Sequence, residues 1–366
     1  MLENLISATI GPAAVEVDGR GEFPRASIGT LLANGYGGLI SAGAVGGGGG
    51  SFADAAAVVR RLASVCGSTA MVYTMHLAAT AVIEQVGPDD VRRDIAAGLH
   101  LSTLAFSERG SRSHFWATLS TARAEDDSVV LDADKSWVTS AGEADSYVWT
   151  SRPLAGDGPS TMWLVPADTA GVKVAAPFDG LGLRGNASSP VDALGARVPM
   201  GCMLGADGGG LDLALSAVLP WFLLLNASGS LGFGDAALAK TLDHLKSARL
   251  EHLGQALIDQ PAPRGRYGRL RVVLDSAGAL VDDACAALAS GRADAALRML
   301  EAKAAAAEAA LEVTGEAMRL GGGAAFRRDL GIERHFRDAQ AAAVMAPTTD
   351  ALHDMIGRAL AGMPLL

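Results

Sequence analysis

The chain has 366 residues, of which 49% are hydrophobic and 19% are charged. This length and composition predict a packed globular protein and exclude a disordered one. Its net charge of −10 and its lack of a basic run exclude the electrostatic signature of nucleic-acid binding. The three cysteines, Cys66, Cys202 and Cys285, lie far apart without metal-ligand spacing, so we expect buried small residues and no metal site.

Residues 1–104 are predicted to form a helical domain, because apolar side chains recur at helical spacing from Val58 to Cys66. The glycine run at 46–50 is unsuited to the interior of a helix or strand. It is either a flexible loop, the alternative that we favour, or a site of close packing. No basic segment precedes an apolar run at the start, so we expect no secretory signal and a cytoplasmic location.

Residues 105–205 change in character to short runs rich in Val, Thr, Trp and Tyr. Gly, Asp and Pro separate these runs at a spacing of roughly ten residues, which is typical of a small β barrel or sandwich. The expected strands are Ser128–Leu131, Ser136–Thr139, Tyr147–Ser151, Met162–Val165 and Val172–Ala175.

Residues 206–366 are predicted to be helical again. The apolar stretch Leu211–Gly234 contains Asp, Pro and Asn, which indicates a core helix and not a membrane span. Between Leu297 and Met318, apolar residues recur at alternating spacings of three and four, so they form one face of a long helix. We expect the glycines at 321–323 to end this helix.

Five segments form an ordered set that spans nearly the whole chain. They are SERGSRSHF at Ser107–Phe115, KSWVTSAGEAD at Lys135–Asp145, GGGAAF at Gly321–Phe326, ERHFRDA at Glu333–Ala339 and APTTD at Ala346–Asp350. This set resembles the segments TEPGAGSD, K-x-W-I-T-N-x-x-x-A-D, G-G-x-G-F, E-R-x-x-R-D-A and E-G-T-S-E of the acyl-CoA dehydrogenases. The resemblance implies their α+β fold, with an N-terminal helical domain (1–104), a middle β-barrel domain (105–205) and a C-terminal four-helix bundle (206–366).

The resemblance also implies noncovalent FAD. A flavin ring needs an apolar or aromatic wall and hydrogen bonds at its polar edge and at N5. By resemblance, Trp137 packs on the flavin, Thr139 forms a hydrogen bond near N5 and Ser107 bonds the pyrimidine edge. Thr348 matches the family threonine that contacts the cofactor. The alternative is that Trp137 is a core residue of the β domain and that the two hydroxyls are ordinary strand or turn groups, but we favour the flavin contacts.

Glycines remove side chains where a ligand must approach the backbone closely. Gly322 and Gly323 are therefore expected to lie near the FAD diphosphate, although three glycines after a helix are by themselves only a C-cap signal. Ser113 matches the family serine beside the pantetheine arm of the substrate. The neighbouring Phe115 is bulky where the family has a small acidic turn, so we expect it to contact the substrate.

The family's catalytic base is absent from this sequence. The family places a glutamate at one of two positions, which are Ala346 and Phe222 here, and neither side chain can accept a proton. We expect both residues to line the substrate pocket instead. Asp350 and Glu108 are weak candidates for a replacement base, so the catalytic residue is unknown.

A second departure concerns coenzyme A. The family often holds the CoA end of its substrate with an Asp and an Arg, and these positions are Pro220 and Leu223 here. The surrounding run VLPWFLLL is apolar throughout. We therefore expect weak recognition of the CoA nucleotide, whereas the residues predicted to face the flavin match the family.

These features leave three functions open. The first is an FAD-dependent oxidoreductase acting on an acyl thioester that is linked to CoA or to a carrier protein. The second is a flavin-dependent oxidase or monooxygenase of the same fold that uses oxygen, and the third is a catalytically silent flavin-binding or assembly subunit. We expect a homodimer or homotetramer, with electron-transfer flavoprotein or oxygen as the electron acceptor and no nucleic-acid or membrane partner.

Overall fold

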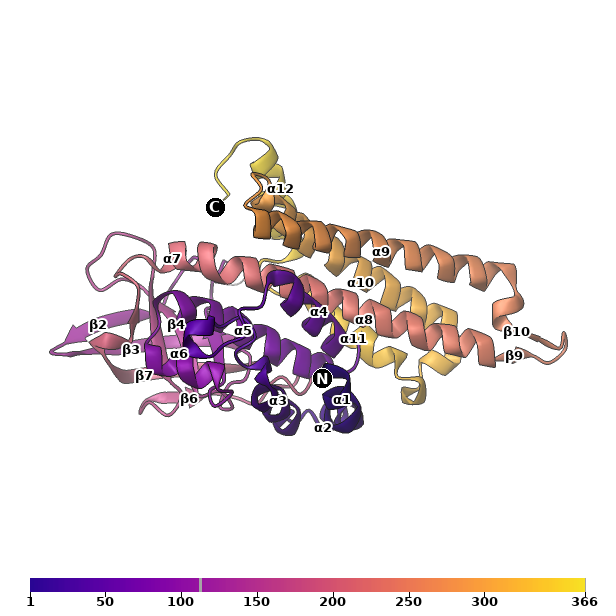
Figure 1. The fold of residues 1–366 in the computed structure, drawn as a ribbon, viewed down its shortest axis with the longest axis horizontal. Coiled ribbons are helices and arrows are strands. Elements are labelled where there is room, and N and C mark those ends of the chain that lie inside the picture. Colours follow the sequence, from indigo (N-terminus) through magenta and orange to yellow (C-terminus); the bar gives the residue numbers. More distant parts are fainter. Residues whose placement is uncertain (112–113, 366) are drawn as a thin grey trace. The chain divides into compact units, whose positions relative to one another are not determined.

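The computed structural model of the protein describes residues 1–111 and 114–365, which form helices, two four-stranded β-sheets and a two-stranded hairpin (Figure 1). The mixture of helices and sheets confirms the predicted α+β fold. The described chain divides into two compact units. The first comprises Met1–Ala55, Met71–Gly180 and Arg184–Phe222, and the second comprises Ala56–Ala70, Leu181–Leu183 and Leu223–Leu366.

The N-terminal part of the chain is helical up to Ala96. Its central helix, α5, is buried on nearly all sides, which explains why its apolar residues show no one-sided pattern. The helices are α1 (Leu2–Leu5), α2 (Gly11–Arg20), α3 (Arg25–Leu31), α4 (Phe52–Ala63), α5 (Gly67–Val86) and α6 (Asp89–Ala96), with π-helical turns at Ile6–Ile10 and Leu32–Tyr36 and a 3₁₀ turn at Gly43–Val45.

The glycine run at 46–50 is a packed segment of the first unit and not a free loop. The amide of Gly48 donates to the carbonyl of Gly38 at 2.9 Å, and the amide of Gly50 donates to the carbonyl of Leu39 at 2.8 Å. A Cβ atom on Gly50 would lie 2.8 Å from that same carbonyl oxygen. Our preference for a flexible loop is therefore wrong, because close backbone packing requires these glycines.

The strands of the first unit form two four-stranded sheets. One has the order β1-β4-β5-β8, with β1 parallel to β4 and the other pairs antiparallel, and the second has the order β2-β3-β7-β6 and is antiparallel. The strands are β1 (Ser102–Ala105), β2 (Thr121–Glu125), β3 (Ser128–Val138), β4 (Ser146–Ser151), β5 (Thr161–Pro166), β6 (Val172–Val174), β7 (Ser189–Pro199) and β8 (Met203–Leu204).

Strand β3 differs most from expectation. The two short strands predicted at 128–131 and 136–139 are one strand of 11 residues, and irregular pairing with β7 interrupts it twice. Such bulges break the alternation of side chains along a strand, so the sequence pattern divides where the backbone continues. The three charged residues between the two runs, Asp132, Asp134 and Lys135, hid the continuity.

The core of the first unit lies between helices and the β1-β4-β5-β8 sheet. Ala79 and Val82 of α5 share one buried cluster with Val148 of β4 and Leu164 of β5. The sheet strands β4 and β5 are almost completely buried, as expected for a sheet covered on both faces. Phe115 and Phe222, which we expect to contact the substrate, also pack against this cluster.

A continuous helical segment, Gly210–Ser247, follows the strands as α7 (Gly210–Leu213), a π-helical turn (Ala214–Val218) and α8 (Leu219–Ser247). Its length and its mean hydropathy of 1.6 would suffice for a membrane span, and it is the one such helix in the described chain. However, 56% of the most apolar window is buried inside the protein, as in a core helix. This agrees with the prediction for Leu211–Gly234.

The long helices of the second unit pack closely through small residues. A Cβ atom on Gly234 of α8 would lie 2.6 Å from Leu274 of α9, so glycine permits this approach. Helix α10 packs against α9, α11 and α12. The remaining elements are α9 (Pro261–Ser290), α10 (Ala295–Ala325), α11 (Ile332–Val344), α12 (Thr349–Leu360) and the short hairpin β9 (Arg249–Leu250) and β10 (Gln255–Ala256), with 3₁₀ turns at Met200–Cys202, Leu257–Asp259 and Arg328–Leu330.

Candidate active site

Strand β3 of the first unit carries an exposed indole. Trp137 is 70% exposed and has a φ of 56°, a left-handed conformation that bulky residues rarely adopt. The pairing of β3 with β7 shifts register between Lys135 and Val138, and both of these residues are buried. The exposure of Trp137 contradicts the alternative that it belongs to the β-domain core. The indole face is instead accessible to a planar partner.

Thr139 lies just beyond the end of β3 and is almost completely buried. Its Oγ1 atom is 2.9 Å from Oγ of Ser188, and the amide of Ser188 donates to Oδ1 of Asn186 at 3.1 Å. This network fixes the hydroxyl of Thr139. Ser188 was not predicted as a site residue. In the sequence it is marked only as the last residue of the Asn186-Ala187-Ser188 triplet, which has no functional meaning here.

Ser107 is half-buried and lies beside β3 through a short antiparallel bridge. Its carbonyl accepts a hydrogen bond from the amide of Ser136 at 2.9 Å, and the amide of Arg109 donates to the carbonyl of Asp134 at 3.0 Å. Ser107 therefore lies opposite the residue that precedes Trp137. The first unit thus brings the three predicted flavin contacts to one end of β3.

Glu108 is 3% exposed and its carboxylate is fully engaged. Its Oε1 accepts from Nζ of Lys135 at 2.6 Å, and the hydroxyl of Ser120 and the amide of Leu119 also donate to the carboxylate. Burial raises the pKa of the Glu108 carboxyl, but the ion pair and the hydrogen bonds outweigh it and lower the pKa overall. The structure therefore argues against Glu108 as the replacement base.

Phe115 and Phe222, which we predict at the substrate, pack against the same cluster in the core of the first unit. Both are partly buried, and the ring centroid of Phe115 lies 5.1 Å from that of Trp116 in an edge-to-face arrangement. Ser113, another predicted substrate contact, lies outside the described residues. The first unit therefore packs both predicted aromatic contacts against one apolar cluster.

In the second unit, the glycines at 321–323 kink helix α10 but do not end it. Gly322 has a φ of 54° and a ψ of −140°, and the helix resumes as far as Ala325. A Cβ atom on Gly321 would lie 2.5 Å from Cβ of Ala325, whereas one on Gly323 would have no neighbour within 4 Å. The expected helix end is thus corrected. The backbone at Gly323 is open to an approaching group, as the predicted contact with a diphosphate requires.

The loop between α11 and α12 carries the other predicted contacts of the second unit. Ala346 is half-buried, and Thr348 caps α12, where its Oγ1 accepts from the amide of Ala351 at 3.3 Å. Asp350 lies in the first turn of α12 and is exposed. A carboxylate in that position stabilises the helix N-terminus, which gives Asp350 a structural role unrelated to a base.

Lys303 contacts this loop, although sequence analysis does not single it out. Its Nζ donates to the carbonyl oxygens of Ala342, Met345 and Pro347. A signal is present in the sequence, because Lys303 is a lone cation between alanines and next to the apolar stripe predicted for this helix. Lysine is almost never fully buried without a specific partner.

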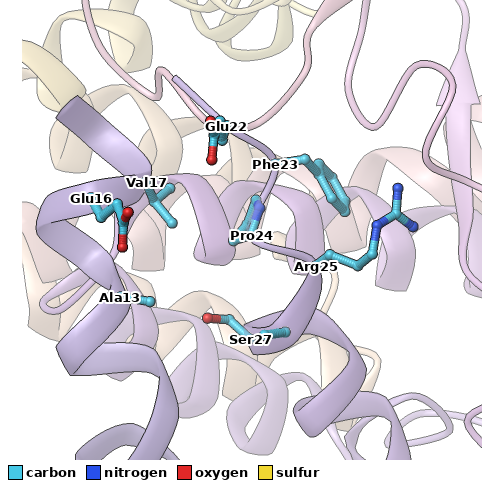
Figure 2. Close-up of a pocket in the computed structure, with 9 residues that line it drawn as sticks. Ala13, Glu16, Val17, Glu22, Phe23, Pro24, Arg25 and Ser27 are labelled. Atoms are coloured by element: carbon cyan, nitrogen blue, oxygen red, sulfur yellow. The ribbon is translucent and has the colours of Figure 1, made fainter. Parts of the chain in front are cut away.

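A small cleft of about 180 Å³ lies between α2 and α3 in the first unit (Figure 2). No residue predicted for the cofactor or the substrate lines it. Arg25 on its rim forms an ion pair with Glu143 and places its guanidinium 5.9 Å from the ring centroid of Phe23. The cleft is therefore held by structural contacts and is not the predicted site.

Comparisons with known proteins match the chain along almost its whole length. The N-terminal, middle and C-terminal domains of acyl-CoA dehydrogenase match residues 1–100, 103–193 and 208–361. The short-chain specific acyl-CoA dehydrogenase of Bos taurus is 28% identical over 93% of this chain and 83% of that protein.

Solved structures give the same result. Butyryl-CoA dehydrogenase from Megasphaera elsdenii superposes with a TM-score of 0.92 at 22% identity, covering 98% of this chain and 96% of the other. FkbI, described for biosynthesis of the methoxymalonyl extender unit of a polyketide immunosuppressant, superposes with a TM-score of 0.88 at 25% identity and 99% coverage of each chain.

The fold and these matches define an oxidoreductase of the flavoprotein class. The chain belongs to the acyl-CoA dehydrogenase family. The family and its three-part fold were predicted from five short motifs, and the comparisons confirm both.

Proposed function

We propose that this chain binds FAD and oxidises an acyl thioester whose acyl group is a specialised one outside ordinary fatty-acid β-oxidation. The exposed indole of Trp137, beside the half-buried Ser107 and the fixed hydroxyl of Thr139, carries the proposal. A flat apolar wall and nearby hydroxyls are what an isoalloxazine ring requires. FAD, when bound, would supply a two-electron acceptor.

The residues of the chain would bind and orient the reactants. Trp137 would cover one face of the flavin, and Thr139 and Ser107 would offer hydrogen bonds to its polar atoms. By the family resemblance, Gly322, Gly323 and Thr348 of the second unit would be further cofactor contacts, and a Cβ atom on either glycine would have no neighbour within 4 Å. Of the predicted acyl contacts, Phe115 and Phe222 belong to the first unit and Ala346 belongs to the second.

The lack of a proton acceptor restricts the substrate. Ala346 and Phe222 replace the family's glutamate, and Glu108 is held in a buried ion pair. General-base assistance is typically worth about 10²–10⁴-fold in rate, so a plain saturated acyl chain would react slowly here. We therefore infer an acyl group with an acidic or already activated C–H bond, such as a vinylogous, aromatic or hydroxylated acyl group.

The carrier is inferred to be recognised mainly near the thioester. Pro220 and Leu223 provide no charged side chain where the family often holds the CoA nucleotide. Charge-assisted hydrogen bonds typically contribute about 1.5–3 kcal/mol each, and they are missing here. A pantetheine or carrier-protein thioester would consequently bind about as well as a CoA thioester. FkbI, which is described for biosynthesis of a polyketide extender unit, supports a biosynthetic acyl group by its similarity to this chain.

Anaerobic titration of the purified protein tests this proposal. The protein should be yellow, and CoA, pantetheine and carrier-protein thioesters should bleach its flavin absorbance without oxygen. Trimming CoA to pantetheine should change KM by less than about tenfold. A protein that takes up no FAD after reconstitution contradicts the proposal, and a hundredfold rise in KM on trimming contradicts the carrier assignment.

A second function, a flavin oxidase or monooxygenase that uses oxygen, is favoured by one observation. The chain supplies no base at Ala346 or Phe222. Oxygenation by a reduced flavin does not require removal of an α-proton, whereas oxidation of an acyl chain does, so the observation favours the monooxygenase in particular. If no thioester bleaches the flavin, but an added reductant causes oxygen uptake and an oxygenated acyl product, this second function replaces the first. Mass spectrometry of the products of a thioester panel distinguishes the two.

We also propose a homodimer or homotetramer that passes its electrons to electron-transfer flavoprotein or to oxygen. Support comes from exposed large apolar residues of the second unit, including Val272 at 65% and Phe326 at 85% exposure. Light scattering at micromolar concentration checks the assembly, and a monomer contradicts it. Reoxidation of the reduced flavin by each acceptor, measured separately, identifies the electron acceptor.

A further inference from the structure

Lys303 is completely buried on α10 of the second unit, and its ammonium group is surrounded by backbone carbonyls. Nζ donates to the carbonyl oxygens of Ala342 at 2.9 Å, Met345 at 3.3 Å and Pro347 at 2.9 Å. These acceptors match the three N–H bonds of a lysine ammonium. Burial lowers the pKa of this ammonium to about 8, and no carboxylate among the described residues forms an ion pair with it.

The three carbonyls belong to the end of α11 and to the loop that follows. Ala342 lies in the last turn of α11, where carbonyls have no partner within the helix. The positive charge is also favourable at the negative end of the helix dipole. Met345 and Pro347 lie outside the helix, so the same ammonium joins the helix end to the loop.

The peptide planes of the loop are thereby fixed. Because a peptide group is planar, the carbonyl of Met345 sets the plane that leads into Ala346. The carbonyl of Pro347 likewise sets the plane that leads into Thr348. One side-chain atom therefore controls the backbone on the N-terminal side of both residues that we expect to face the substrate and the cofactor.

We propose that Lys303 is a positioning residue, which holds the loop 345–348 so that Ala346 and Thr348 are presented in one fixed arrangement. The importance of that arrangement for catalysis rests on the function proposed above. Helix packing alone does not call for a lysine, because alanines fill the neighbouring buried positions of α10. A buried ammonium is costly unless every N–H bond is satisfied, and the helix-end carbonyl of Ala342 and the two loop carbonyls satisfy all three.

Hydrogen exchange of the protein, compared between wild type and Lys303→Met, tests the proposal directly. Methionine has a similar length but neither the charge nor the N–H donors. The hydrogen-bonded amides at the two ends of the loop, those of Met345, Ala351 and Leu352, should exchange about tenfold faster or more in the variant, while the interiors of α9 and α10 keep their protection. Lys246→Met is the matched control, because Lys246 is exposed on α8, and it should leave the loop unchanged.

Unchanged exchange at the amides of Met345, Ala351 and Leu352 in Lys303→Met overturns the proposal. Equal acceleration throughout α8–α12 also overturns it, because Lys303 would then support only the packing of the helices. If Lys303→Met does not fold, Lys303→Gln decides the matter, since it keeps two N–H donors on a neutral side chain. Its loop should exchange faster than that of wild type, and wild-type protection there overturns the proposal.

The kinetic consequence is measured separately. For Lys303→Met, kcat/KM of thioester oxidation should fall about tenfold or more, with kcat reduced as well as KM raised, because a displaced loop misaligns the bound reactants. Lys246→Met should keep wild-type values of both. Hydrogen exchange needs no substrate, so a wild-type protein that oxidises no thioester refutes the proposed function without affecting the loop test.

Discussion

The Nζ atom of Lys135 lies 2.6 Å from Oε1 of Glu108, and the two side chains are 0% and 2% exposed. The same Nζ atom donates to the carbonyl and the hydroxyl of Thr150 at 2.7 and 2.9 Å, and it lies 5.1 Å from the ring centroid of Trp149. This ion pair attaches the segment that carries Ser107 to strand β3. The position of one predicted flavin contact thus depends on a buried charge pair.

Removing one partner of this pair should destabilise the protein strongly. Lys135→Met leaves the Glu108 carboxylate buried without its cation, so the free energy of unfolding should fall by about 3–5 kcal/mol. Urea denaturation followed by fluorescence measures the change. Arg20→Met is the control, because the ion pair of Arg20 with Glu16 is exposed and should matter little. A loss below about 1 kcal/mol for Lys135→Met contradicts the prediction.

The same pair predicts how stability depends on pH. The pKa of Glu108 is lowered in the fold from its ordinary value of 4.5. Its stabilising contribution is therefore complete above about pH 4.5 and is lost as the pH falls through the lower, folded-state pKa. Glu108→Gln should flatten this part of the acid dependence of the urea midpoint. An unchanged slope below pH 4.5 in that variant would show that other carboxylates cause it.

Trp137→Ala should weaken FAD binding with little effect on folding. The side chain is exposed, so its removal creates no cavity in the protein, but the flavin would lose an aromatic wall. We expect the dissociation constant for FAD to rise about tenfold or more, with the thermal midpoint of the apoprotein unchanged. Leu194→Ala, which removes another exposed apolar side chain from β7 of the same sheet, should leave FAD affinity unaltered. Equal FAD affinity in wild type and Trp137→Ala contradicts the prediction.

Ala346→Glu should raise the rate with plain saturated acyl-CoA substrates. The substitution places a carboxylate where the family has its base, and the expected gain is about 10²-fold if only the base is missing. Anaerobic stopped-flow measurement of flavin reduction gives the rate. Asp350→Asn is the control and should change little, since Asp350 is exposed in the first turn of α12. Rapid desaturation of butyryl-CoA by the wild-type protein would refute the missing-base hypothesis.

The sequence predicted the features that depend on short segments. The family, the fold and the proximity of Trp137 to Thr139 follow from motifs in which the residues are neighbours along the chain. The structure adds Ser188, which lies 49 positions from Thr139 and shares a hydrogen bond with it. Contacts of this kind depend on strand pairing, and a single sequence does not reveal which strands pair.

The failures have a physical cause in common. The glycine run at 46–50 and the glycines at 321–323 look alike in sequence, because glycine permits both a free turn and close backbone contact. Only the packing around each glycine distinguishes a free turn from close backbone contact. The amides of Gly48 and Gly50 donate to backbone carbonyls of an earlier segment, and Gly322 forms a kink inside α10. Lys303 was not predicted, because its hydrogen-bond partners are backbone carbonyls, which have no sequence signature.

The bulge in β3 decides which side chains at the end of the strand face outward. Regular alternation would place Lys135 and Trp137 on the same face, and the register shift between Lys135 and Val138 separates them. Deletion of Ser136 would remove the extra residue, so regular alternation from the buried Lys135 would give an outward indole and an inward Val138 without a bulge. At its present length, the strand keeps Trp137 exposed between two buried neighbours because its pairing with β7 is irregular. The outward side of this strand end is therefore set by its hydrogen-bonded partner strand and not by the order of its side chains alone.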